Sequence, residues 1–112
     1  MDNLLKQALL YDFYGELLTS HQKEVDELYI VHDLSLSEIA AEKGISRQGV
    51  HDLIKRCTKS LLSYEETLHL VEKFVKVKEK VKEIEDIAEH ASKKDEGYNK
   101  IKQITDEIIR EL

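Results

Sequence analysis

The segment from Leu36 to Leu53 carries the pattern that most narrowly restricts how this chain can fold. Ala40 is a small residue at the point where a second helix can cross close to the first, and Gly44 tolerates the positive φ angle of a tight turn. Apolar side chains occur where they would fill the angle between two such helices: Ile39, Ile45, Val50 and Leu53. This spacing predicts a helix-turn-helix motif, whose second helix is presented to the major groove of DNA.

The composition of the whole chain favours helix. The 112 residues include no proline and only four glycines, and 36% are charged. Straight side chains such as Leu, Glu and Lys keep their rotamer freedom in a helix. We therefore expect an all-α fold with helices over about residues 3–18, 20–31 and 36–43, and a further helix from Arg47.

Three polar residues mark where these helices should begin. Thr19 is followed by Gln22 and Ser35 by Glu38, which is the spacing of a capping box. Ser46 is expected to cap the helix that starts at Arg47. The apolar positions then predict which faces are buried. The inward sets are Leu5, Ala8, Leu9, Tyr11 (or Asp12), Phe13 and Leu17 in the first helix, Val25, Leu28 and Tyr29 in the second, and Val50, Leu53, Ile54, Cys57 and Leu61 in the fourth.

Beyond residue 64 the hydrophobic period changes. A heptad seam is formed by Leu70, Phe74, Val77, Val81, Ile84, Ala88 and Ala91. A turn is expected over Ser92–Gly97, followed by a helix with one apolar face formed by Tyr98, Ile101, Ile104, Ile108 and Leu112. These helices would form either a hairpin packed on its own chain or an arm for homodimerisation. We expect a helix-turn-helix module over residues 1–64 and a helical extension over residues 65–112.

The charge distribution suggests what the motif contacts. Residues 43–60 carry a net charge of +4, whereas the rest of the chain carries −10. A basic island on an acidic chain suits phosphate contact, because neutralised phosphates release counterions. Outward residues near the start of the fourth helix are the candidates for contact with bases: Arg47, Gln48, His51 and Lys55. The candidates for phosphate contact are Arg56, Lys59 and the helix starts at Ser35 and Ser46.

Other readings of the same surface remain open. A net charge of +4 is modest for DNA binding, and residues 1–42 carry −7, which would repel a nearby duplex. The surface would then dock a protein. A second nucleic-acid contact along the lysines between residues 73 and 82 is a weaker alternative.

No catalytic constellation emerges, so we expect a non-enzymatic protein without cofactor or metal. Glu66 and His69 have a spacing used in di-iron bundles, but such sites need two of these pairs and further carboxylates. Cys57 lies on an apolar helix face and is expected to be a buried, inert thiol. The charged residues leave no run long enough for membrane insertion. The single cysteine and the lack of a visible signal sequence fit a cytoplasmic protein.

The N-terminal two thirds of the chain resemble a known family. The resemblance is carried by Asp12-Phe13-Tyr14, Leu17-Leu18-Thr19, Gln22, Glu27-Leu28-Tyr29, Asp33 to Ala40, Ile45 to Val50, Ile54-Lys55-Arg56, Tyr64-Glu65-Glu66 and Leu68-His69-Leu70. Together they resemble the YlxM family of Gram-positive bacteria, encoded beside the genes of the signal recognition particle. Locally the motif is similar to region 4 of bacterial sigma factors, which binds promoter DNA.

The resemblance implies a cytoplasmic regulator that acts in the signal recognition particle pathway. Its partner would be DNA or, alternatively, the protein or RNA of that particle. Two positions depart from the family pattern: Lys43, where relatives usually have an apolar residue, and Gly49, where alanine is more usual.

Overall fold

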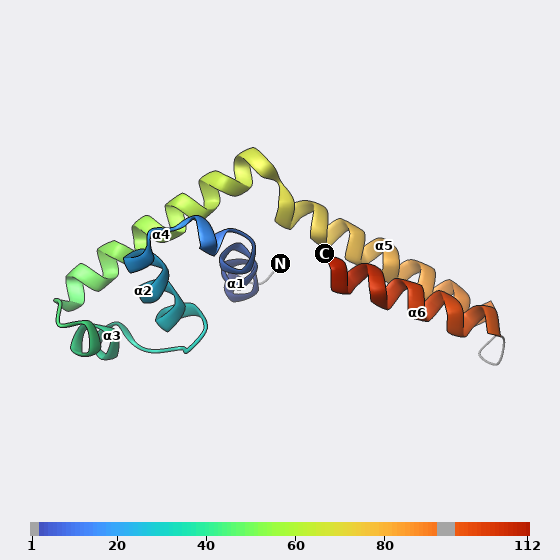
Figure 1. Ribbon diagram of the computed structural model, residues 1–112, viewed down its shortest axis with the longest axis horizontal. Coiled ribbons are helices and arrows are strands. Elements are labelled where there is room, and N and C mark those ends of the chain that lie inside the picture. Colours follow the sequence, from blue (N-terminus) through green and yellow to red (C-terminus); the bar gives the residue numbers. More distant parts are fainter. Residues whose placement is uncertain (1–2, 92–95) are drawn as a thin grey trace. The chain divides into compact units, whose positions relative to one another are not determined.

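The computed structural model describes residues 3–91 and 96–112. Within these residues the chain is helical, without strands, and confirms the all-α expectation (Figure 1). The elements are α1 (Asn3–Tyr14), the short 3-10 helix η1 (Gly15–Leu17), α2 (Ser20–Ile30), α3 (Leu36–Lys43), α4 (Arg47–Leu68), α5 (Leu70–Ala91) and α6 (Glu96–Glu111). Two compact units are formed by Met1–Val71 and Glu72–Leu112. The expected domain boundary after residue 64 stays a prediction.

The expected helix starts are confirmed in atomic detail. Thr19 and Ser35 each form a complete capping box with Gln22 and Glu38, respectively. Gly44 ends α3 with φ 68°, the left-handed conformation that side chains disfavour. The local sequence therefore sets the positions of these helix boundaries.

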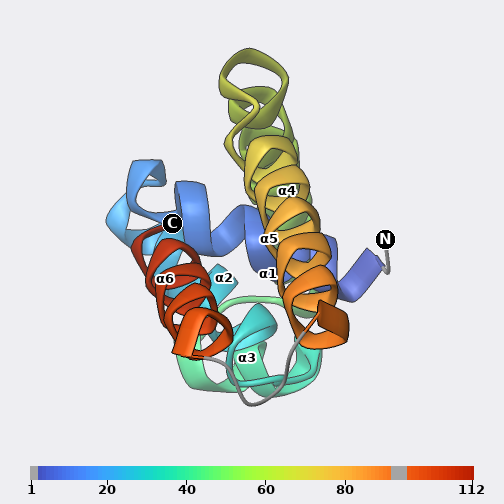
Figure 2. The same cartoon turned by 90° about the vertical axis from the view of Figure 1, so that its right-hand side faces the viewer.

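The core of the first unit lies where three helices meet α4. Val25, Ile39, Val50 and Ile54 form the buried cluster. Partly buried hydrophobic residues surround it: Leu28, Tyr29, Leu34, Leu36, Ala40 and Leu53. Figures 1 and 2 show that α1, α2 and α3 lie on the same side of α4, which leaves its opposite side uncovered within this unit.

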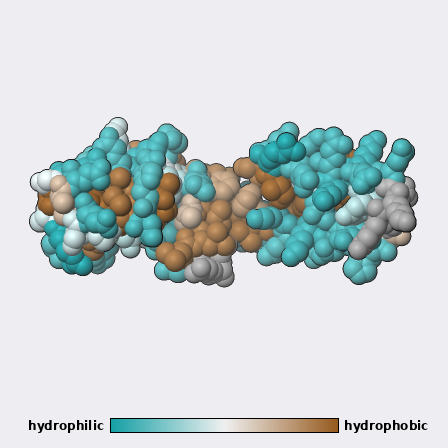
Figure 3. Space-filling view, turned by 90° about the horizontal axis from the view of Figure 1, so that it is seen from below, coloured by the Kyte–Doolittle hydropathy of each residue, from teal (hydrophilic) through white to brown (hydrophobic). Residues whose placement is uncertain are grey.

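The buried face of α1 differs from the expected one. Leu10, Tyr14 and Leu18 are buried, whereas Leu5 and Leu17 are more than half exposed. The chain tightens into η1 after Tyr14, and a 3-10 helix has three residues per turn, so the α-helical phase is lost before Leu17. Figure 3 shows hydrophobic surface gathered around the beginning of α1.

A second correction concerns Ile45, which was expected to fill the angle of the motif. Its side chain is 37% exposed, because it lies in the turn after the Gly44 cap and outside the cluster around Ile39 and Val50. The angle is closed instead by side chains from α2, chiefly Val25.

A polar node links α1 to the junction of α4 and α5. The Tyr14 hydroxyl donates to Glu65 Oε1 at 2.5 Å and accepts from the Leu70 N–H at 3.0 Å. The same Glu65 oxygen accepts from the Val71 N–H at 3.0 Å. Two early N–H groups of α5 are thus capped by side chains of other elements, and α4 ends at His69 with φ 56°.

The second unit is an antiparallel pair, α5 and α6, which run side by side in Figures 1 and 2. Val81, Ala88 and Thr105 are its buried residues in the described part, and the Thr105 hydroxyl donates to Glu85. The expected seam is thus only partly buried. The expected turn at Ser92–Gly97 falls largely outside the described residues, and its last two positions belong to α6.

No helix within residues 3–91 and 96–112 has the length and hydropathy needed to cross a bilayer.

Asp26 generates a prediction about stability and pH. Its side chain is 2% exposed and its Oδ2 has no hydrogen-bond partner, so burial raises the pKa of this carboxyl to about 6. The carboxyl is neutral in the folded chain and ionised in the unfolded chain between about pH 4 and pH 6. Stability should therefore fall as pH rises through this window and stay reduced above it.

We expect Asp26→Asn to stabilise the protein at pH 7 by up to roughly 2–3 kcal/mol, with a gain that shrinks towards pH 4. Urea unfolding of both proteins at several pH values measures this difference. A gain of equal size at pH 4 and pH 7 would contradict the assignment.

Tyr14 generates a second prediction. Tyr14→Phe removes the hydroxyl that contacts Glu65 and leaves the Leu70 N–H without its acceptor, so we expect a loss of about 1–3 kcal/mol in unfolding free energy. The matched control is Tyr64→Phe, because the Tyr64 ring lies 6.1 Å from the Tyr14 ring but its hydroxyl takes no part in the node. Equal losses for the two variants in chemical denaturation would argue against a special role for the node.

Candidate nucleic-acid interface

The second helix of the motif is held by its first turn and by its apolar side. Ser46 accepts the Gly49 N–H at 2.9 Å and so caps α4 as expected. Val50, Ile54, Cys57 and Leu61 of α4 are buried. With this stripe turned to the core, the positions between its members must face away from it.

The predicted contact residues on α4 are all exposed. This applies to Arg47, Gln48, His51, Lys55, Arg56 and Lys59. None of the four cations among them forms an ion pair within residues 3–91 and 96–112. We call these four, Arg47, Lys55, Arg56 and Lys59, the cationic face. It spans more than three turns of α4 and is not covered by the acidic helices α1 and α2 of the same unit.

Lys43 lies within the basic segment of residues 43–60, but its charge is paired with an acidic residue of the same unit. Its Nζ lies 3.0 Å from Glu24 Oε2 on α2. The hydrogen bond and the charge of Lys43 lower the pKa of the Glu24 carboxyl, so this carboxylate is ionised at neutral pH. The charge of Lys43 is thereby offset within the chain. Its side chain is three quarters buried, consistent with a stem that packs on the core.

Asp52 places an acidic group beside the cationic face. The Gln48 Nε2 donates to Asp52 Oδ1 at 3.0 Å, and His51 Nδ1 lies 3.5 Å from the same oxygen. The hydrogen bond from Gln48, followed by that from His51, lowers the pKa of Asp52. Gln48 is therefore oriented by Asp52, and it must exchange this partner to contact a base edge.

The two helix starts differ in what they offer a phosphate. At Ser35 the capping box brings the Glu38 carboxylate to the backbone N–H at 3.0 Å, and this hydrogen bond lowers the pKa of Glu38. An anion already lies at this helix start. At Ser46 the hydroxyl serves the Gly49 N–H, and no carboxylate is part of the cap. Of the two, the start of α4 is the better phosphate site.

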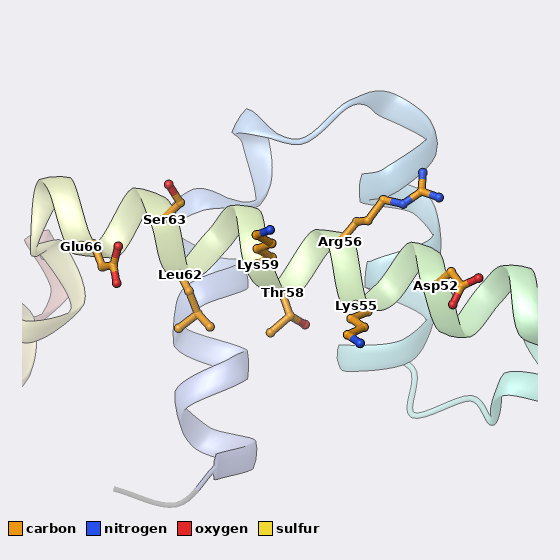
Figure 4. Close-up of a pocket in the computed structure, with 8 residues that line it drawn as sticks. All are labelled: Asp52, Lys55, Arg56, Thr58, Lys59, Leu62, Ser63 and Glu66. Atoms are coloured by element: carbon orange, nitrogen blue, oxygen red, sulfur yellow. The ribbon is translucent and has the colours of Figure 1, made fainter.

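Figure 4 shows an open hollow that follows α4 beyond the predicted contact residues. It is lined by Asp52, Lys55, Arg56, Thr58, Lys59, Leu62, Ser63 and Glu66. Arg56 and Ser63 point to one side of the helix in this view, and Thr58 and Leu62 to the other. The sequence reasoning did not include Thr58, Leu62, Ser63 or Glu66, although their spacing along an amphipathic helix places them on its outer side.

Other candidate groups lie outside this surface or are inactive. Cys57 is buried, its Sγ lies 3.8 Å from the Gln22 carbonyl oxygen, and burial raises the pKa of the thiol to about 11. This agrees with the expected inert thiol. The lysines at 73, 76, 78, 80 and 82 are exposed on α5, where Lys76 pairs with Glu72 at 3.0 Å.

Comparison with known proteins places this geometry in a family. Residues 1–106 match the model of UPF0122, described as "Putative helix-turn-helix protein, YlxM / p13 like". A UPF0122 protein of Clostridium novyi is 39% identical, with 98% of each chain covered. A UPF0122 protein of Thermoanaerobacter sp. is 42% identical over 99% of this chain and 94% of the relative. One from Caldanaerobacter subterraneus subsp. tengcongensis is 48% identical over 76% of this chain and 73% of the relative.

The match covers both units of the structure, including the motif formed by α3 and α4. This chain belongs to the UPF0122 family, the YlxM/p13-like helix-turn-helix proteins.

Proposed function

We propose that this protein is a cytoplasmic, non-enzymatic regulator that binds DNA with the outer side of α4 and acts in the signal recognition particle pathway. Arg47, Gln48, His51 and Lys55 approach the bases. Arg56, Lys59 and the helix start at Ser46 contact phosphates, with a lesser contribution from the start at Ser35.

The observation that carries this proposal is the exposure of the cationic face. Four cations project from the second helix of the motif, while Lys43, the fifth cation of the segment, is offset by Glu24. Cations on this helix neutralise phosphates when the helix enters the major groove. The link to the particle rests on the family resemblance and on the gene neighbourhood of its members.

The alternative is an accessory factor that binds the protein or the RNA of the signal recognition particle without a role in transcription. One observation favours it: Asp52 stays ionised within the same surface and occupies Gln48. A carboxylate at this position opposes a phosphate backbone but suits a basic protein partner. Retention of the particle from native lysate after nuclease treatment, with no binding to any DNA at low salt, would favour this alternative.

The cationic face predicts a steep salt dependence of DNA binding. Fluorescence anisotropy with a labelled duplex, recorded between about 50 and 200 mM salt, should show affinity falling with a slope near the number of neutralised phosphates, about three to four. Lys55→Ala should weaken binding to all sequences and reduce the slope by about one. The matched control is Lys6→Ala on α1, which removes an exposed lysine of the same unit outside the cationic face. If both variants change the slope equally, the face is not the contact surface.

Asp52 allows a test with the opposite sign. Asp52→Asn removes one negative charge from the surface while keeping an acceptor for Gln48, so DNA affinity should rise by roughly threefold to tenfold at low salt. Glu42→Gln is the control, because Glu42 is an exposed carboxylate on α3 outside this surface. Weaker DNA binding by Asp52→Asn, together with stronger binding by Glu42→Gln, would place the duplex elsewhere on the unit.

A further inference from the structure

The α5–α6 unit leaves most of its large apolar side chains exposed. Its buried residues in the described part, Val81, Ala88 and Thr105, are small or of medium size. In contrast, five isoleucines are between 36% and 70% exposed: Ile84, Ile87, Ile101, Ile104 and Ile108. A two-helix unit of about 40 residues buries little apolar surface by itself, so a covering surface for these side chains would add stability to it.

The five isoleucines lie on one side of the helix pair. Each residue of a helix is rotated by about 100° from the one before it. On α5 the buried residues Val81 and Ala88 mark the direction that faces α6. Viewed along the helix axis, Ile84 lies about 50° and Ile87 about 110° to one side of that direction. On α6, Ile101, Ile104 and Ile108 lie about 40° to 100° from Thr105 in the same rotational sense. Because the helices are antiparallel, the same rotational sense turns both sets to the same face of the pair. We call these five residues the isoleucine face.

The opposite rotational side is polar. It carries Glu85, Lys78 and Lys102. The face of the α5–α6 unit that is turned to the viewer in Figure 3 is predominantly hydrophilic. Glu85 also accepts the hydrogen bond from Thr105, which fixes the alignment of the two helices along each other. The unit is therefore an amphipathic slab with one apolar face.

Charge along α5 indicates what covers this face. Residues 72–82 hold five lysines and two glutamates, a net charge of +3, whereas residues 83–91 hold three glutamates and one aspartate, a net charge of −4. The two halves of one helix are thus complementary to each other. A second copy of α5 placed antiparallel on the first brings each basic half against an acidic half.

We propose that the isoleucine face is a homodimer interface, in which two copies of the α5–α6 unit pack face to face as an antiparallel four-helix bundle. A two-fold axis crosses α5 near the change of sign between Lys82 and Glu83, perpendicular to the helices. The contact is isologous, so Ile84 and Ile104 lie near the axis and Ile87, Ile101 and Ile108 flank it. The bundle follows the packing known for short antiparallel helices.

The alternative alignment, with the two copies of α5 pointing the same way, is disfavoured by the same charges. In each helix pair, residues 83–91 and 96–103 form one end, which has a net charge of −3. The parallel alignment brings these two negatively charged ends next to each other. The antiparallel arrangement instead pairs this end with the end formed by residues 72–82 and 104–112, whose net charge is +1.

Dimerisation through the isoleucine face does not depend on DNA binding by α4. An experiment that disproves one of these two proposals leaves the other standing. If both hold, the dimer carries two copies of the motif, and a second contact compensates for the weak binding of a single motif.

Sedimentation velocity of the full chain tests the interface. We expect a dimer at about 100 µM protein and at least a tenfold weaker association for the double variant Ile87→Lys, Ile104→Lys. Ile87 is 70% exposed and Ile104 45%, so these changes should leave the helical circular dichroism unchanged. The control, His90→Lys with Gln103→Lys, adds the same charge at exposed positions on the outer sides of the same helices and should remain dimeric.

Two results would overturn the proposal. A monomeric wild-type chain at this concentration means that the face is covered by the same chain or by another protein. A double variant that dimerises as well as the control places the interface elsewhere, for example at the hydrophobic surface of α1.

A distance measurement tests the antiparallel alignment. Nitroxide labels are attached to cysteines introduced by Lys73→Cys or Lys80→Cys, two exposed positions one heptad apart on α5. The buried Cys57 thiol, whose pKa is raised to about 11, resists labelling. A rise of 1.5 Å per residue gives axial separations between copies of about 28 Å at position 73 and about 8 Å at position 80. Equal distances at the two positions would overturn the alignment.

Discussion

The apolar stripe of α4 is the feature on which the rest of the first unit depends. Val50, Ile54, Cys57 and Leu61 follow one side of the helix, and the three shorter helices pack against that side. Burial of each such side chain contributes about 1.5–3 kcal/mol, and it fixes the rotation of α4 about its own axis. The side chains of the cationic face lie between these buried positions and therefore point away from the core. Core packing therefore determines the orientation of the candidate interface.

Ion pairs and caps within the unit then decide how much charge that interface retains. Glu24 offsets Lys43, and Glu38 fills the helix start at Ser35. The start of α4 carries no such carboxylate in its cap, and the nearest acidic group on the helix is Asp52, about one and a half turns further on. The positive potential is thus concentrated on one side of one helix. This concentration counts for more in phosphate binding than the net charge of the chain, because the interaction between charges falls steeply with distance and is screened by salt.

The two units use their polar groups in different ways. Tyr14 of α1 and Glu65 of α4 accept the hydrogen bonds of the first two N–H groups of α5, so side chains of these two helices define the start of α5. In the α5–α6 unit Thr105 and Glu85 align two helices that bury few large side chains. A polar contact of this kind specifies alignment more than it stabilises, since its net contribution is about 1 kcal/mol.

Local sequence was enough to predict the helix starts at Thr19, Ser35 and Ser46 and the turn at Gly44. It also predicted that Arg47 and Lys55 face outward. These follow from side chains that act within a few residues of their own backbone, or from the period of a single helix. Three features became visible only in the packed structure. Leu10 and Tyr14 replace Leu5 and Leu17 in the core, Asp26 is buried with its Oδ2 unpaired, and Glu24 offsets the charge of Lys43. Each of these features depends on which side chains of separate helices come into contact. The hydrophobic pattern of one helix does not say how a neighbouring helix is rotated about its own axis.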